Sequence, residues 1–163
     1  MEDAIKELGH LALGTRLKRL GDRLQMQTQV ILDGVGVPVP ASHLPALACL
    51  KRHGAMTVGD LSRSLGVRQP GVTRMARALE EAGLIQSGPA EGDRRARVLD
   101  ITPAGQDWLV RLEEGTFPWV EAAVREACGD AAGSLLDNLA ALEEALEQVP
   151  LAGRTLRLSQ GER

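Results

Sequence analysis

The chain has 163 residues, a length that suits one domain with helical extensions, and 44% of them are hydrophobic, as in ordinary globular proteins. Aromatic residues make up only 2%, which argues against modules that stack several bases on aromatic rings. The formal net charge of −3 excludes a uniformly basic protein but leaves room for a local basic face.

The first predicted element is a helix from Ala4 to about Leu32, a stretch without proline. Its apolar residues recur at helical spacing and form a narrow stripe: Leu13, Leu17, Leu20, Leu24 and Ile31. Such a stripe is typical of a helix that packs against another helix. Two glycines and two prolines in DGVGVPVPASH then end this helix.

A second helix is predicted from His43 to about His53. Ser42 is its expected N-cap, Pro45 lies in its first turns, and Gly54 follows its end.

The next segment has the pattern of two short helices joined by a tight turn. Thr57 and Asp60 form a capping-box-like start, and Gly66 supplies the turn. The following helix has Pro70 at its first position and Gly83 after its end. One face of this helix is apolar, with Val72, Met75, Ala76 and Leu79, and the other is polar and basic, with Gln69, Gly71, Thr73, Arg74 and Arg77. This is the plan of a helix-turn-helix.

Two strand-like segments follow the second of these helices. LIQSG and RVLDIT alternate apolar and polar residues, and the turn-rich GPAEGDRRA separates them. The sequence therefore predicts a β-hairpin, and a helix-turn-helix followed by a hairpin is a winged helix. The predicted fold class is mainly α with a small β-hairpin wing (α+β).

The remainder of the chain is predicted to be helical. Thr102-Pro103 opens a helix with Trp108, Leu109 and Leu112 on one side, and Pro118 should kink or restart it. A helix from Pro118 to Ala127 precedes a last helix from about Ala131 to Gln148, and the tail 151–163 is expected to be frayed. The last helix carries a stripe of leucines: Leu135, Leu139, Leu142 and Leu146.

The long apolar stripes at both ends of the chain predict a homodimer, because the winged helix does not need them for its own core. Residues 4–32 and 104–148 are the expected dimerisation helices, and 41–103 is the expected winged helix-turn-helix that binds double-stranded DNA. The candidate dimerisation residues are Leu13, Leu17, Leu20, Leu135, Leu139 and Leu142.

The sequence contains no pattern that points to catalysis or to a cofactor. Cys49 and Cys128 lie far apart without zinc-ligand or disulfide spacing, and the three histidines have no metal-ligand spacing either. No catalytic set or phosphate-binding glycine loop stands out. The N-terminus lacks the plan of a signal peptide, and no apolar run approaches the roughly 20 residues that span a bilayer. We therefore expect a cytoplasmic protein that is not an enzyme and has no membrane partner.

The chain resembles the multiple-antibiotic-resistance regulator (MarR) family of bacterial transcription factors. The resemblance is carried by DLSRSLGV, VTRMARALEEAGLI, the Asp-x-Arg of Asp93 and Arg95, and LDITPAG. It implies a homodimer, often a repressor, that binds a pseudo-palindromic operator and releases it on binding a small aromatic or lipophilic effector. It also implies a recognition helix from about Gln69 to Ala82, and a minor-groove contact by Arg95 that Asp93 orients.

Charge placement supplies the other candidate DNA contacts. Arg74 and Arg77 lie close to one helical turn apart and can contact a base edge and a phosphate together. The wider candidate set is Ser62, Arg63, Arg68, Gln69, Thr73, Arg94 and Arg97, of which Arg94 and Arg97 are expected to meet phosphates or solvent. Trp108 and Trp119 are expected in the core or a dimer interface, with lining of an effector pocket as a second interpretation.

Two alternatives remain open at this stage. A winged helix that has lost DNA binding would serve as a protein-interaction module. A regulator that keeps DNA binding could instead sense oxidants through Cys128, although Met1 to Leu32 contains no cysteine of the kind that some relatives use.

Overall fold

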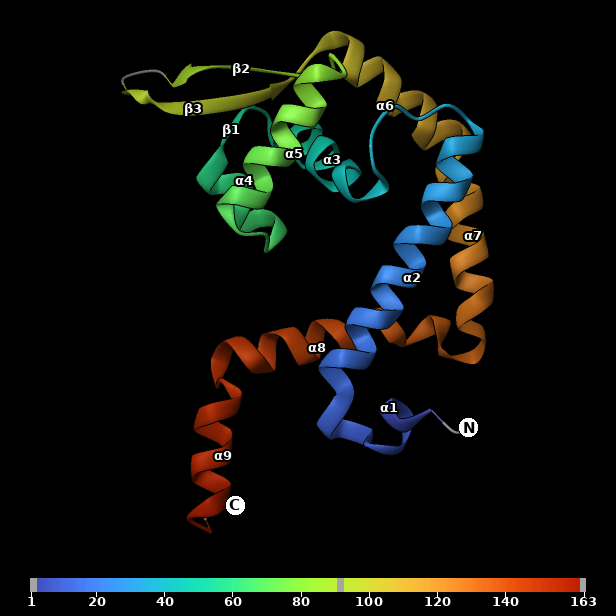
Figure 1. Cartoon of the computed structure of the whole chain (residues 1–163), viewed down its shortest axis with the longest axis vertical. Helices are drawn as coiled ribbons and strands as arrows, with labels where there is room; N and C mark the ends of the chain where they lie inside the picture. Colours follow the sequence, from blue (N-terminus) through green and yellow to red (C-terminus); the bar gives the residue numbers. More distant parts are fainter. Residues whose placement is uncertain (1–2, 91–92, 162–163) are drawn as a thin grey trace. The chain divides into compact units, whose positions relative to one another are not determined.

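The structure, a computed structural model, describes residues 3–90 and 93–161, with side chains for all of these except 90 and 93–96 (Figure 1). It is mainly helical with one small antiparallel sheet, which confirms the predicted fold class. The chain divides into two units, Met1–Val120 and Glu121–Arg163. In the described residues, every helix is too short or too polar to cross a membrane.

The N-terminal segment corrects the prediction of one continuous helix. Helix α1 (Ala4–Glu7) and a 3-10 turn (Gly9–Ala12) precede the long helix α2 (Leu13–Gly34), and Gly9 has a φ of 53°. The Arg19 guanidinium donates to both carboxylate oxygens of Asp3, at 3.0 and 2.7 Å. In an unbroken helix these residues would be about 24 Å apart. The chain therefore turns at Gly9, where a left-handed backbone suits glycine, and α1 folds back on α2.

Helix α3 (Leu44–His53) starts later than predicted. Residues Ala41–His43 form a 3-10 turn, so Ser42 lies within that turn and is not the N-cap. The amide of Ala41 donates to the Gln29 side chain of α2 at 2.6 Å, which holds this turn against the preceding helix. Gly54 ends α3 with a φ of 78°, as predicted.

The helix-turn-helix matches its sequence pattern closely. Helix α4 (Val58–Leu65) begins at Thr57, whose hydroxyl accepts from the Asp60 amide at 3.1 Å. Gly66 makes the turn in the left-handed region. Helix α5 (Gln69–Glu81) follows, with Pro70 at its second position rather than its first.

The hairpin belongs to a sheet of three strands, one more than predicted. The strands are β1 (Met56–Thr57), β2 (Ile85–Ala90) and β3 (Asp93–Ile101), in the order β1-β3-β2. Met56 pairs with Leu99, and Ser87 pairs with Leu99 from the other side. The start of the helix-turn-helix is thus bonded directly to the wing (Figure 1).

One hydrophobic core lies beneath these elements. Its largest fully buried side chains are Leu32, Leu47, Leu50, Leu61, Val72, Leu79, Leu99 and Leu109. Helix α6 (Pro103–Gly115) joins this core and begins at Thr102, whose hydroxyl accepts from the Gly105 amide at 3.0 Å. Helix α6 therefore starts from the root of the wing.

Helix α7 (Phe117–Cys128) starts one residue before Pro118, so the proline restarts the helix. In the second unit a 3-10 turn (Gly129–Gly133) leads to α8 (Leu135–Gln148) and α9 (Leu151–Ser159). The helical α9 corrects the expectation of a frayed tail. Arg154 donates to the Val149 carbonyl at 2.9 Å and also to the Ala145 carbonyl, and so satisfies the end of α8.

Candidate nucleic-acid interface

Helix α5 presents two faces of opposite character. Val72, Met75, Ala76 and Leu79 are buried in the core. The outer face of α5 consists of the exposed residues Gln69, Thr73, Arg74 and Arg77, and Arg68 is exposed just before the helix. The sequence-predicted division of this helix is therefore the observed one. A polar, cationic surface on a helix whose other side is anchored in a core has the chemistry that phosphates and base edges require.

The side chains of the outer face differ in the hydrogen bonds and ion pairs that they make within the protein. Arg77 Nε donates to Glu81 Oε1 at 2.8 Å, and this hydrogen bond raises the pKa of the Arg77 guanidinium. The Thr73 hydroxyl donates to the Gln69 carbonyl at 3.0 Å. Arg74 makes no hydrogen bond or ion pair with the side chains that the structure describes. Of the arginines on this face, Arg74 is the one whose donors are all available to an incoming group.

The two candidates on α4 serve the helix-turn-helix itself. The Ser62 hydroxyl donates to the Val67 carbonyl at 2.6 Å and closes the turn before α5. Arg63 forms an ion pair with Asp60. Thr57 donates to the same carboxylate at 2.6 Å, and hydrogen bonding from Thr57, assisted by the charge of Arg63, lowers the pKa of Asp60. Arg63 therefore holds the start of α4, and Ser62 holds its end.

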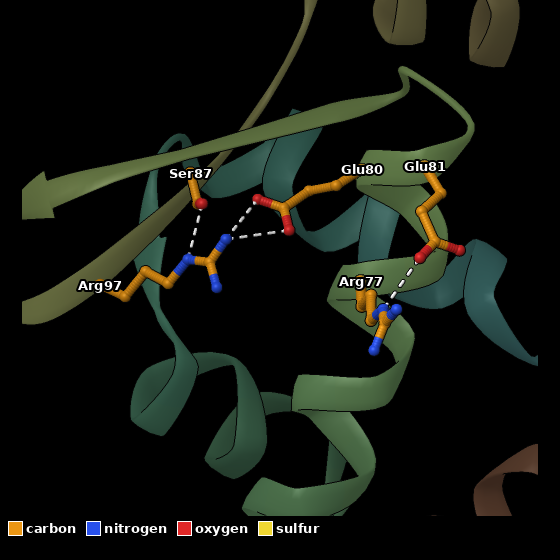
Figure 2. Close-up of polar contacts among 5 residues, drawn as sticks. All are labelled: Arg77, Glu80, Glu81, Ser87 and Arg97. Atoms are coloured by element: carbon orange, nitrogen blue, oxygen red, sulfur yellow. Dashed lines mark hydrogen bonds and ion pairs between the residues drawn. The ribbon is translucent and has the colours of Figure 1, made fainter.

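Arg97 is the only one of the predicted wing arginines whose side chain lies in the described part of the chain. Its Nε donates to Ser87 Oγ at 2.6 Å, and its Nη2 lies 2.9 and 3.0 Å from the two carboxylate oxygens of Glu80 (Figure 2). Arg97 thus joins β3 to β2 and to α5. The backbone of Asp93, Arg94 and Arg95 belongs to β3, but their side chains lie outside the described residues, so their predicted DNA contacts remain predictions.

Glu80 and Ser87 were not singled out from the sequence, although a signal for them exists. Side chains alternate between the faces of a strand, so Arg97 points to the same face as the buried Leu99 and Ile101. The neighbouring strand β2 contacts α5. The alternation therefore places the Arg97 guanidinium within reach of the polar residues at the end of α5.

Residues 39–96 match the model of the MarR family, a region that begins before α3 and ends within the wing. Over these residues the chain is similar to the MarR family. It is 33% identical over 98 residues to the HTH-type transcriptional repressor MdtR of Bacillus subtilis, an alignment that covers 60% of each chain. It is also 27% identical over 97 residues to an HTH-type transcriptional regulator of Mycobacterium tuberculosis, which covers 60% of this chain and 68% of the relative.

A solved structure of the transcriptional repressor CouR bound to a 23-mer DNA duplex superimposes with a TM-score of 0.70. The two chains are 26% identical, and the match covers 83% of this chain and 96% of CouR. The family and these relatives are transcriptional regulators, not enzymes.

The predicted dimerisation residues lie on two helical stripes that are incompletely covered. On α2, Leu13 is half-buried while Leu17 and Leu20 are exposed. On α8, Leu135, Leu139 and Leu142 are half-buried. The structure contains a single chain, so the homodimer remains a prediction.

The two tryptophans occupy different surroundings. Trp108 on α6 is half-buried and packs against the core, whereas Trp119 on α7 is 77% exposed. A cavity of about 250 Å³ between α1 and α2 contains neither of them and is lined by Asp3, Lys6, Arg16, Arg19, Leu20 and Arg23. Their predicted part in an effector pocket therefore stays a prediction.

The cysteines and histidines form no cluster. Cys49 packs against the core beside Met56, with 3.6 Å between the two sulfur atoms, and Cys128 is half-buried. No group of three or more metal-ligating side chains occurs among the residues that the structure describes. Burial lowers the pKa of His43, whose Nδ1 is buried and has no hydrogen-bond partner among the described residues.

Proposed function

We propose that this protein is a dimeric DNA-binding transcription repressor that places α5 in the major groove and its wing toward the flanking minor groove. The observation that carries the proposal is the outer face of α5, which is cationic and exposed on a helix anchored by four buried side chains. The CouR structure, which contains a DNA duplex, supports it because the fold matches over most of both chains. The proposed DNA-binding region is 41–103.

The geometry ranks the candidate contacts. Arg74 donates to none of the described side chains and sits mid-helix, so we assign it a bidentate contact to guanine. Arg68, Gln69, Thr73 and Arg77 surround it and are assigned to phosphates or neighbouring base edges. Ser62 and Arg63 are committed to α4 and its turn, so their contacts are the weaker ones. Arg95, oriented by Asp93, is assigned to the minor groove, and Arg94 to a phosphate.

The dimer follows from the exposed apolar stripe of α2. Leu17, Leu20 and Leu24 are all more than a third exposed, and burying a leucine contributes about 2 kcal/mol. We assign 4–32 and 104–148 to the dimer interface. A twofold dimer would read a pseudo-palindromic operator with half-sites about one helical turn apart.

The proposed effector is a small organic compound. In relatives of this family a small aromatic or lipophilic compound weakens DNA binding, and Trp108 and Trp119 are the residues we assign to its pocket. Calorimetry against phenolic acids and lipophilic compounds tests this. The absence of heat and of operator release at millimolar ligand would dismiss an effector of these classes.

The central experiment measures binding to the DNA upstream of the gene by fluorescence anisotropy. Arg74→Ala and Arg95→Ala should each weaken binding about 10- to 100-fold, because each removes a specific contact of about 1–3 kcal/mol. Arg157→Ala, which removes an exposed cation from α9 outside the proposed interface, is the matched control and should bind like wild type. Unchanged affinity of both test variants at physiological salt would sink the proposed contacts.

A further inference from the structure

Arg97 connects three elements at the base of the wing. Its guanidinium holds Ser87 of β2 through Nε and Glu80 of α5 through Nη2, while its backbone belongs to β3 (Figure 2). Glu80 is the more enclosed partner, with its side chain 24% exposed against 59% for Arg97. A charge-assisted network that crosses three elements constrains their relative direction more than an isolated surface pair does.

The regular ladder of the hairpin ends at the same place. Regular pairing runs from Ile85 opposite Ile101 to Pro89 opposite Arg97, and the register then shifts between Pro89 and Ala90. This irregularity interrupts the backbone ladder, so the pairing is weak where the distal wing begins. Backbone hydrogen bonds alone therefore fix the wing poorly beyond this pair, and the Arg97 side chain acts at the point where they weaken.

We propose that Arg97 is a positioning residue, which fixes the direction of the wing relative to the recognition helix α5 through Glu80 and Ser87 and does not bind a phosphate. This inference rests on the proposed DNA-binding function. The distal wing carries Arg95, the arginine assigned to the minor groove. The Arg97–Glu80 contact therefore sets the distance between this arginine and the residues of α5 that are assigned to the major groove.

Charge is consistent with this role. The Glu80 carboxylate neutralises the Arg97 guanidinium and would repel a phosphate brought near it. The neighbouring pair on the same helix differs in one respect: Arg77 and Glu81 are both on α5, four residues apart, so their contact joins no second element. The two pairs therefore have the same chemistry but only one of them spans the helix and the wing (Figure 2).

The test compares the two pairs on a duplex selected by the wild-type protein from a random pool. Glu80→Ala and Arg97→Met should each weaken binding about 5-fold, since either one breaks the contact, and the double variant should be no weaker than the worse single variant. The two substitutions change the net charge in opposite directions, so a shared direction of effect cannot come from long-range attraction. The slope of log affinity against log salt should stay unchanged in both.

Two controls make the comparison sharp. Glu81→Ala has the same charge change one residue away and should bind at least as tightly as wild type. Arg97→Lys keeps the charge but loses the forked guanidinium, so it should behave like Arg97→Met. A role in stability alone would lower the folded fraction without changing preference, whereas misdirecting the wing should bring the ratio of affinities for A·T- and G·C-flanked duplexes toward one.

A phosphate-binding Arg97 gives the opposite pattern and would overturn the proposal. Glu80→Ala would then bind DNA more tightly, Arg97→Lys would keep the wild-type affinity, and Arg97→Met would reduce the salt slope by about 0.9 per protomer.

Hydrogen exchange of the DNA-free protein separates this inference from the proposed function. Amides of residues 86–88 and 97–100 should exchange faster in Glu80→Ala than in Glu81→Ala. Equal exchange refutes the positioning role, whereas a wild-type protein that selects no DNA refutes the function.

Discussion

Gly105, in the first turn of α6, has no room for a side chain. A Cβ built on it would lie 2.1 Å from the Leu84 carbonyl oxygen and 3.1 Å from Cγ1 of Ile101. Its φ is not positive, so the constraint is space and not backbone conformation. The same Leu84 carbonyl accepts from the Thr102 amide at 3.0 Å, and the Thr102 hydroxyl donates to the neighbouring Gly83 carbonyl at 2.8 Å.

Replacing Gly105 with alanine should destabilise the protein by about 3 kcal/mol. Ordinary contact distance is about 3.5 Å, so the first turn of α6 must retreat from Leu84 by more than an ångström. Overpacking of this kind costs about 2 kcal/mol, and the two hydrogen bonds of Thr102 contribute about 1 kcal/mol each. The better helix propensity of alanine offsets about 1 kcal/mol.

Urea denaturation followed by circular dichroism measures this difference. The control is Gly115→Ala at the other end of the same helix, where nothing lies within 4 Å of the built Cβ and φ is also not positive. The control should be neutral or slightly stabilising. The reasoning fails if Gly105→Ala unfolds at the wild-type urea concentration while its slope is unchanged.

Three further outcomes are expected. Thr57→Ala should lower the free energy of unfolding by about 1 kcal/mol in urea denaturation because it removes the cap of α4, and Thr57→Ser should restore it; equal loss in both would contradict capping. Burial lowers the pKa of His43 from 6.5, so the unfolded chain takes up a proton at higher pH than the folded chain does. The melting temperature should therefore fall as pH drops below about 6.5. A His43→Gln variant that keeps the same pH dependence would exclude this cause. Arg154→Met should speed amide exchange in α9 about 5-fold, since it removes the side chain that binds the last carbonyls of α8, and unchanged exchange would show that α9 does not depend on it.

Local signals in the sequence were sufficient for the helix-turn-helix. Thr57, Gly66 and the two faces of α5 depend on neighbours within a few residues, and the structure confirms them. For the same reason the exposure of Arg74 could be predicted, because it follows from helical periodicity alone.

Features that depend on distant pairing could not be predicted in this way. Strand β1 has two residues and exists because it pairs with β3 more than 40 residues later. The turn at Gly9 has a local glycine signal, but its direction depends on the ion pair of Asp3 with Arg19. The Arg97–Glu80 contact depends on both the strand register and the packing of α5. The sequence alone therefore predicted only that Arg97 contacts either a phosphate or solvent.

Strand β2 lies at the open edge of the sheet, with β3 on one side and no strand on the other among the described residues. An exposed edge is a template on which a strand from another molecule can add. Gly88 and Pro89 make this edge a poor template, since one weakens the strand and the other cannot donate a hydrogen bond. Gly88 and Pro89 thereby protect the wing from aggregation through edge pairing.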